Sequence, residues 1–138
     1  MENILLEAEK YVIHLLNEEL DSTFVYHNLS HTQRVVAKSK ELAEVSGLSD
    51  NEKNLLELAA WFHDTGFIKG PKTHEKESSK IASSFLKKHN CTEDTIQSVI
   101  VLIMATEMNH QPINVLEKII RDADYIRETS LEFCTYWQ

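Results

Sequence analysis

Residues 55–66 read Leu-Leu-Glu-Leu-Ala-Ala-Trp-Phe-His-Asp-Thr-Gly, and this stretch decides the fold. Its apolar side chains occur on nearly every side of a helix, which is typical of a helix in the centre of a protein. Residues 49–52, Ser-Asp-Asn-Glu, have the pattern of a capping box and place the start of this helix at about Asp50. The central helix therefore carries His63 and Asp64 into the core.

The rest of the chain has the same helical character. Apolar residues recur at helical spacing, and 3 glycines and 2 prolines in 138 residues are too few for the many turns of an all-β protein. We predict an all-α bundle of five to seven helices in a single domain, residues 1–138. The predicted helices cover about residues 4–20, 28–47, 50–62, 74–88, 93–103 and 115–125, with Thr73 and Thr92 as N-caps. Residues 130–138 form a final packed helix or one cut short by truncation.

Composition and charge exclude several functions. With 14 Lys and Arg against 22 Asp and Glu, the formal net charge is −8, which disfavours long nucleic acid and anionic membranes and favours a small metabolite or a cation as partner. No apolar run approaches ~18 residues, so no membrane-spanning helix is expected. The 2 cysteines show no pairing pattern, which predicts a reducing, cytoplasmic location. The 7 histidines indicate metal binding or proton transfer.

A histidine and an aspartate at the end of an apolar helix need a compensating partner, because an unpaired buried carboxylate is strongly unfavourable. Asp64 can cap a local turn or pair with Lys69, with His63 as a hydrogen-bonded core histidine. A divalent cation is another solution, since it neutralises the carboxylate and accepts the imidazole lone pair. His31, in the first turn of the second helix, and Asp124, on the last helix, are further candidate ligands.

Three motifs resemble those of the HD-domain metal-dependent phosphohydrolases. They are Tyr26-His27-Asn28-Leu29-Ser30-His31-Thr32, Ala59-Ala60-Trp61-Phe62-His63-Asp64-Thr65-Gly66 and Arg121-Asp122-Ala123-Asp124. The resemblance covers about residues 20–128. It implies that His31, His63, Asp64 and Asp124 ligate one metal ion inside a bundle of five or more helices, and it defines the site better than the substrate.

The resemblance also implies ligands for a second metal ion. In dinuclear members of the family, histidines at the positions of His74 and His110 complete a second site, and the aspartate of the doublet, here Asp64, bridges the two ions. The alternatives are that His74 is a surface residue at a helix start and that His110 belongs to a loop. A donor set without thiolates suits one or two ions of Mn²⁺, Fe²⁺, Co²⁺, Ni²⁺ or Mg²⁺.

Asp64, His27 and Arg34 are the candidate catalytic residues. Asp64 would bridge the ions or orient the attacking water. The run from Tyr26 to His31 is similar to that of cyclic-nucleotide phosphodiesterases, whose earlier histidine, here His27, donates a proton to the leaving oxygen. Arg34, one turn beyond His31, can hold a phosphoryl oxygen by a bidentate contact. Alternatively, His27 fixes a loop by hydrogen bonds and Arg34 is a solvated surface residue.

A metal centre of this kind predicts hydrolysis of a small phosphate ester, a nucleotide or a related metabolite, by metal-activated water. Two other functions remain open. Some HD-fold proteins with this ligand order are di-iron oxygenases, and a non-catalytic nucleotide-binding module would also use the fold. An apolar edge at the end of the chain also allows a homodimer.

Overall fold

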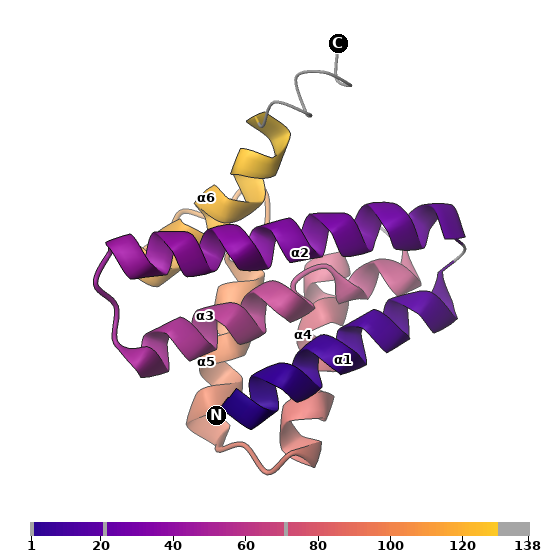
Figure 1. Ribbon diagram of the computed structural model, residues 1–138, viewed down its shortest axis with the longest axis horizontal. Coiled ribbons are helices and arrows are strands. Elements are labelled where there is room, and N and C mark those ends of the chain that lie inside the picture. Colours follow the sequence, from indigo (N-terminus) through magenta and orange to yellow (C-terminus); the bar gives the residue numbers. More distant parts are fainter. Residues whose placement is uncertain (1, 21, 71, 130–138) are drawn as a thin grey trace.

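Six α-helices and one short 3-10 helix make up the described part of the computed structural model (Figure 1). It describes residues 2–20, 22–70 and 72–129, and the side chains of residue 2 and of residues 22–27 and 126–129 lie outside the description. The elements are α1 (Glu2–Glu19), α2 (Ser22–Val45), α3 (Asp50–Phe62), η1 (Thr65–Lys69), α4 (His74–Lys88), α5 (Glu93–Met104) and α6 (Val115–Thr129). No strand occurs in these ranges, so the predicted all-α fold is confirmed.

Local sequence signals account for several helix ends. The Ser49 side chain accepts a hydrogen bond from the Glu52 backbone N–H, and the Glu52 carboxylate accepts one from the Ser49 N–H, so the predicted capping box is formed at the start of α3. Thr92 caps α5 as predicted, because its side chain accepts from the N–H of Thr95. Beyond the end of α2, Gly47 has a φ of 67°, a left-handed conformation that glycine adopts easily.

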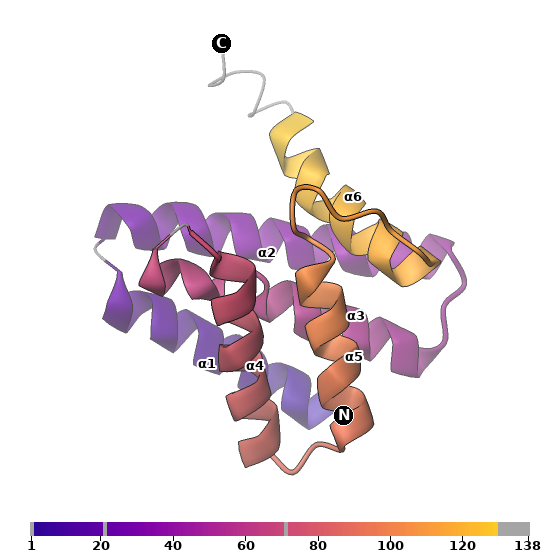
Figure 2. The same cartoon turned by 180° about the vertical axis from the view of Figure 1, so that it is seen from behind.

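The helices α1, α2 and α3 lie side by side, and α4 and α5 cross them on one face (Figures 1 and 2). Helix α6 packs against α2, and α3 contacts every other helix. The apolar residues at the end of α3 are accordingly buried, with Leu58, Ala59, Ala60 and Phe62 each 0% exposed. The predicted central position of this helix is confirmed, and its C-terminus lies in the interior of the bundle.

Two predictions about helix starts are wrong. Helix α2 begins at Ser22, well before residue 28, because serine and threonine at this point start a helix instead of interrupting one. Thr73 precedes α4 without capping it: its backbone is left-handed, with a φ of 56°, and its hydroxyl donates to the Lys72 carbonyl. Residues 130–138, for which a final helix was one of two predictions, lie outside the described residues. Within the described ranges, every helix is too short or too polar to traverse a lipid bilayer.

Candidate metal centre

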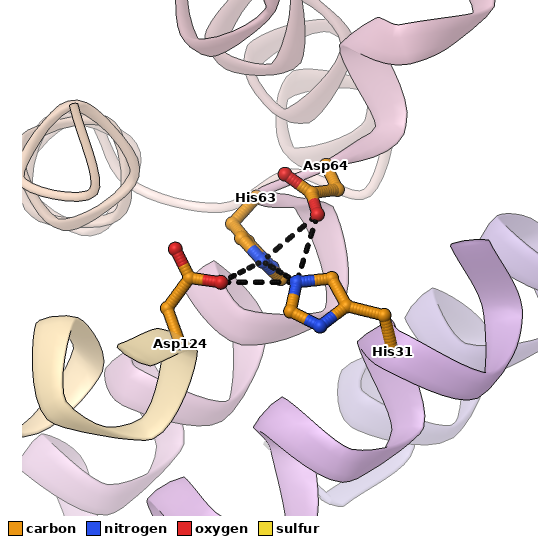
Figure 3. A group of neighbouring side chains, drawn as sticks. All are labelled: His31, His63, Asp64 and Asp124. Atoms are coloured by element: carbon orange, nitrogen blue, oxygen red, sulfur yellow. Dashed lines mark hydrogen bonds and ion pairs between the residues drawn. The ribbon is translucent and has the colours of Figure 1, made fainter. Parts of the chain in front are cut away.

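Four side chains from three helices converge at the C-terminal end of α3 (Figure 3). His31 comes from α2, His63 and Asp64 follow the last residue of α3, and Asp124 comes from α6. Each contributes one potential ligand atom, and these four atoms all lie within 4.8 Å of one another. His31, His63 and Asp64 are buried, and Asp124 is half-buried. The structure therefore brings together the four residues whose sequence motifs implied a common site.

The donor atoms are spaced as ligands of one ion would be. Nε2 of His31 lies 3.0 Å from Oδ2 of Asp64 and 2.9 Å from Oδ1 of Asp124. Nε2 of His63 lies 3.3 and 3.5 Å from the same two oxygens. Ligands about 2.1 Å from a shared ion are separated by about 3.0 Å in octahedral and about 3.4 Å in tetrahedral geometry. The four residues fit a divalent cation.

The backbone fixes the orientation of the His63 ring. Its Nδ1 lies 2.7 Å from the carbonyl oxygen of Ala60, one turn earlier in the chain, and donates a hydrogen bond to it. In the neutral imidazole the proton is then on Nδ1, and the lone pair of Nε2 points at the other three donors. A second hydrogen bond that fixes the tautomer in this way is typical of metal-ligating histidines.

Without a cation, a proton holds the cluster together. Burial disfavours the charged form of His63, but the nearby carboxylates of Asp64 and Asp124 outweigh burial and raise the pKa of His63 well above its ordinary value. Burial likewise opposes ionisation of Asp64, yet the His63 charge and hydrogen bonds from three histidines hold the pKa of Asp64 well below its ordinary value. The two carboxylates therefore favour a positive charge at this site, either a proton on His63 or a metal ion.

The turn after α3 is fixed by Ser78, which lies one turn into α4. The Ser78 hydroxyl donates a hydrogen bond to the carbonyl of His63 and accepts one from the N–H of Gly66, and both bonds are 2.8 Å long. Gly66 has no room for a side chain, because a Cβ there would contact the carbonyl oxygen of His74 and come within 2.7 Å of the Ser78 backbone nitrogen. This close approach of η1 to α4 holds Asp64 between His63 and His74.

A cavity of about 480 Å³ opens beside the four donors. Such a volume is in the range of small-molecule sites. The residues that line it are His31, Asp64, Phe67, His74, Glu75, Thr106, Met108, Arg121, Asp124 and Tyr125. A small ligand can therefore reach the metal-binding atoms from solvent.

His74 lies near the carboxylate oxygen of Asp64 that is not directed at His31 and His63. Its Nε2 is 3.4 Å from Oδ1 of Asp64 and 3.2 Å from the carboxylate of Glu75. Asp64 therefore directs one oxygen toward His31 and His63 and the other toward His74, the arrangement that a bridging aspartate needs.

The other predicted site residues are placed differently. Nε2 of His110 lies 2.6 Å from the buried carboxylate of Glu117, and His110 is not among the described residues that line the cavity. Its assignment to a second metal ion stays a prediction. Arg34 is half-buried on α2 and does not line the cavity in the described part of the chain. The side chain of His27 lies outside the description, so its catalytic role also stays a prediction.

Sequence reasoning assigned no role to Arg121, which lines the cavity, or to Glu117, a buried residue of α6 that is not among the described lining residues. Arg121, one turn before Asp124, donates hydrogen bonds to the carbonyls of Ala105, Glu107 and Met108. Glu117 accepts from the N–H of Ile113 and contacts His110. The only sequence signal was their spacing, since Glu117, Arg121 and Asp124 lie at helical intervals on one face of α6.

Comparisons with known proteins agree with the geometry. The family model described as the HD domain matches residues 28–128, which is most of the chain and contains all four donors of the central group. The searches of curated proteins and of solved structures found no match. The chain therefore belongs to the HD domain family, a superfamily of metal-dependent hydrolases that are mostly phosphohydrolases.

Proposed function

We propose that the protein hydrolyses a small phosphate ester, a nucleotide or a related metabolite, with a divalent metal ion held by His31, His63, Asp64 and Asp124. The observation that carries this proposal is the convergence of four donor atoms at the edge of an open cavity. Two imidazoles and two carboxylates leave coordination positions for water and for a phosphoryl oxygen. The absence of thiolates from this group favours Mn²⁺, Fe²⁺, Co²⁺, Ni²⁺ or Mg²⁺.

When bound, the ion would lower the pKa of a water molecule and polarise a phosphoryl oxygen. The chain supplies the rest of the mechanism. The Nδ1 hydrogen bond to Ala60 keeps the lone pair of His63 directed at the ion. If a single ion is bound, Asp64 Oδ1, which faces His74, would orient the attacking water by accepting a hydrogen bond from it. On the leaving side we propose His27 as the proton donor and Arg34 as a ligand of a phosphoryl oxygen.

A second ion is a further part of this proposal. Asp64 Oδ1 and His74 Nε2, 3.4 Å apart, would be two of its ligands, with Asp64 as the bridge. His110 would have to leave its contact with Glu117 to join them. Counting ions per chain tests this directly, because a single ion requires only His31, His63, Asp64 and Asp124.

The test of the function is a comparison of metal-free and reconstituted protein. Metal-free protein should be inactive, and protein loaded with Mn²⁺ should hydrolyse at least one member of a panel of phosphomonoesters, cyclic nucleotides and nucleoside triphosphates. The variant Asp64→Asn should abolish this activity. Asp122→Asn is the matched control, because Asp122 belongs to the same sequence motif as Asp124, but its side chain is about half exposed and pairs with Lys118.

Two results would replace the hydrolase proposal with another function. Turnover that requires O₂ in protein reconstituted with Fe²⁺, without any hydrolysis of phosphate esters, would identify an HD-fold oxygenase. Nucleotide binding without conversion, in protein loaded with Mn²⁺ or Fe²⁺, would identify a binding module. We further propose a cytoplasmic location, because the 2 cysteines of the sequence show no spacing typical of a disulfide framework.

A further inference from the structure

The charges that line the cavity limit the charge of any ligand it can accept. Three carboxylates line it, those of Asp64, Glu75 and Asp124, and Arg121 is the one lysine or arginine side chain among the described lining residues. With neutral histidines these groups carry two net negative charges. One divalent ion brings the wall to neutrality, and a second ion makes it positive by two charges.

The guanidinium group of Arg121 is already hydrogen-bonded to backbone carbonyls. Its Nη1 donates hydrogen bonds of 2.8 and 2.6 Å to the carbonyls of Ala105 and Glu107, and its Nη2 lies 3.3 Å from the carbonyl of Met108. These carbonyls are at the end of α5 and in the turn after it, where backbone acceptors lack partners within the helix. A phosphate group that bound Arg121 would compete with three carbonyls. The metal ions are therefore the main source of positive charge for a ligand.

Another part of the wall is apolar. Phe67, Met108 and Tyr125 line the same cavity, and Met108 and Tyr125 are 85% and 62% exposed. The Phe67 ring is stacked on the His74 ring, with centroids 4.2 Å apart and an angle of 24° between the planes. Exposed aromatic and thioether side chains beside a polar centre suit a ligand with a flat ring attached to its polar group.

We infer that the substrate is an ester with a single phosphorus atom, a phosphate monoester or diester, on a ring-bearing organic group, and that polyphosphates are disfavoured. This inference rests on the proposed function, because it places the phosphate at the metal centre. A monoester carries roughly two negative charges near neutral pH and a diester one, so a wall made positive by two bound divalent ions balances either ligand, whereas the neutral wall with one ion offers no charge for further phosphates. Among the described lining residues, the additional phosphates of a di- or triphosphate find only Arg121, which is already hydrogen-bonded to three carbonyls, and Glu75 adds repulsion.

Equilibrium dialysis at fixed free Mn²⁺ tests this inference. The ligands are the non-hydrolysable phosphonate analogues of AMP, ADP, ATP and ribose 5-phosphate. We expect the AMP analogue to bind at least tenfold more tightly than the ATP analogue, and at least tenfold more tightly than the ribose 5-phosphate analogue, which lacks the flat aromatic ring of adenine. Equal or tighter binding of the ATP analogue, or equal binding of the ribose 5-phosphate analogue, would overturn the inference.

A pair of variants on α4 tests the electrostatic reason. Glu75→Gln removes one negative charge from the cavity wall and should narrow the ratio of the two dissociation constants, ATP analogue over AMP analogue, at least threefold. Glu77→Gln removes the same charge from a residue that pairs with Lys80 and does not line the cavity, so it should leave the ratio unchanged. A ratio that stays constant or widens in Glu75→Gln would contradict the charge argument.

Hydrolysis assays on the same preparations separate the two proposals. If the analogues bind in the expected order but the loaded protein hydrolyses no ester, the proposed function fails and the ligand class holds. If ATP binds as tightly as AMP and is hydrolysed as efficiently, metal-dependent hydrolysis holds and the inference of a single-phosphorus substrate fails.

Discussion

Nε2 of His31 and Nε2 of His63 lie 3.3 Å apart in the centre of the bundle, each directed at the other. Two Nε2 lone pairs that point at each other repel, so either a cation lies between them or one of the two Nε2 atoms carries a hydrogen. In the metal-free protein the carboxylates of Asp64 and Asp124 raise the pKa of His63 well above its ordinary value against the effect of burial, which favours a proton on this ring. A metal ion would take the place of this proton.

Metal binding should therefore release protons near pH 7. His63 is protonated there in the metal-free protein, and it must lose that proton to become a ligand. Apparent metal affinity should rise with pH, by about tenfold per unit for one released proton, until the pH exceeds the pKa of His63. Calorimetric titrations with Mn²⁺ in two buffers of different ionisation enthalpy measure the number of protons. Buffer-independent heats and a pH-independent affinity would contradict a His63 ligand.

Ser78→Ala should destabilise the turn that carries the site. The loss of the hydroxyl removes the hydrogen-bond partner of the His63 carbonyl and of the Gly66 N–H at a buried place, at a cost of about 1–3 kcal/mol in the free energy of unfolding. Urea denaturation measures this change. Ser79→Ala is the matched control, because the buried Ser79 hydroxyl has no hydrogen-bond partner in the described structure, and this variant should be close to neutral. Equal effects of the two variants would refute the role of Ser78.

Gly66→Ala should separate η1 from α4. The added methyl group would overlap the His74 carbonyl oxygen and approach the Cβ of Glu77 to 2.9 Å, and neither α4 nor the turn can move independently of the site. We expect a loss of roughly 1–3 kcal/mol in stability, together with weaker metal binding. Thermal unfolding with and without Mn²⁺ measures both effects, and a variant as stable as the parent would show that the approach of η1 and α4 is looser than described.

His110→Ala should lower stability and leave the first ion in place. It removes the partner 2.6 Å from the Glu117 carboxylate, which is 1% exposed, so we expect a cost of about 1–3 kcal/mol. His14→Ala, at an exposed position on α1, should have little effect. Chemical denaturation gives the stability, and metal analysis counts the ions. Loss of one of two ions in His110→Ala would instead assign His110 to a second metal site.

The sequence was sufficient to predict the all-α fold, the central helix and the convergence of the four donors. Helical periodicity and the capping box determined the first two, and the resemblance of three motifs to those of HD-domain phosphohydrolases implied the third. The start of α2 was missed, since the second helix was expected from about residue 28, although the serine and threonine at residues 22–23 are residue types that favour helix starts. The local sequence cannot show whether such residues lie in a loop or in the first turn of the next helix, when α1 ends at Glu19 and α2 begins at Ser22.

The wall of the cavity could not be predicted in this way. Arg121 interacts with carbonyls 13 to 16 residues earlier in the chain, and which carbonyls lie near it depends on how α5 and α6 pack. The same holds for Ser78, whose hydroxyl reaches 15 residues back to His63. Side chains that bind metal belong to recognisable motifs, whereas side chains that bind backbone carbonyls across a loop depend on tertiary structure.

The most direct test of the account is the metal content of the protein and of its Asp64→Asn variant after loading with Mn²⁺ and removal of free metal. We predict at least one tightly bound ion per chain in the parent and in Asp122→Asn, and none in Asp64→Asn, with helical circular dichroism unchanged in all three. Full metal content in Asp64→Asn, or no saturable metal binding in the parent, would contradict the assignment of His31, His63, Asp64 and Asp124 as the metal centre.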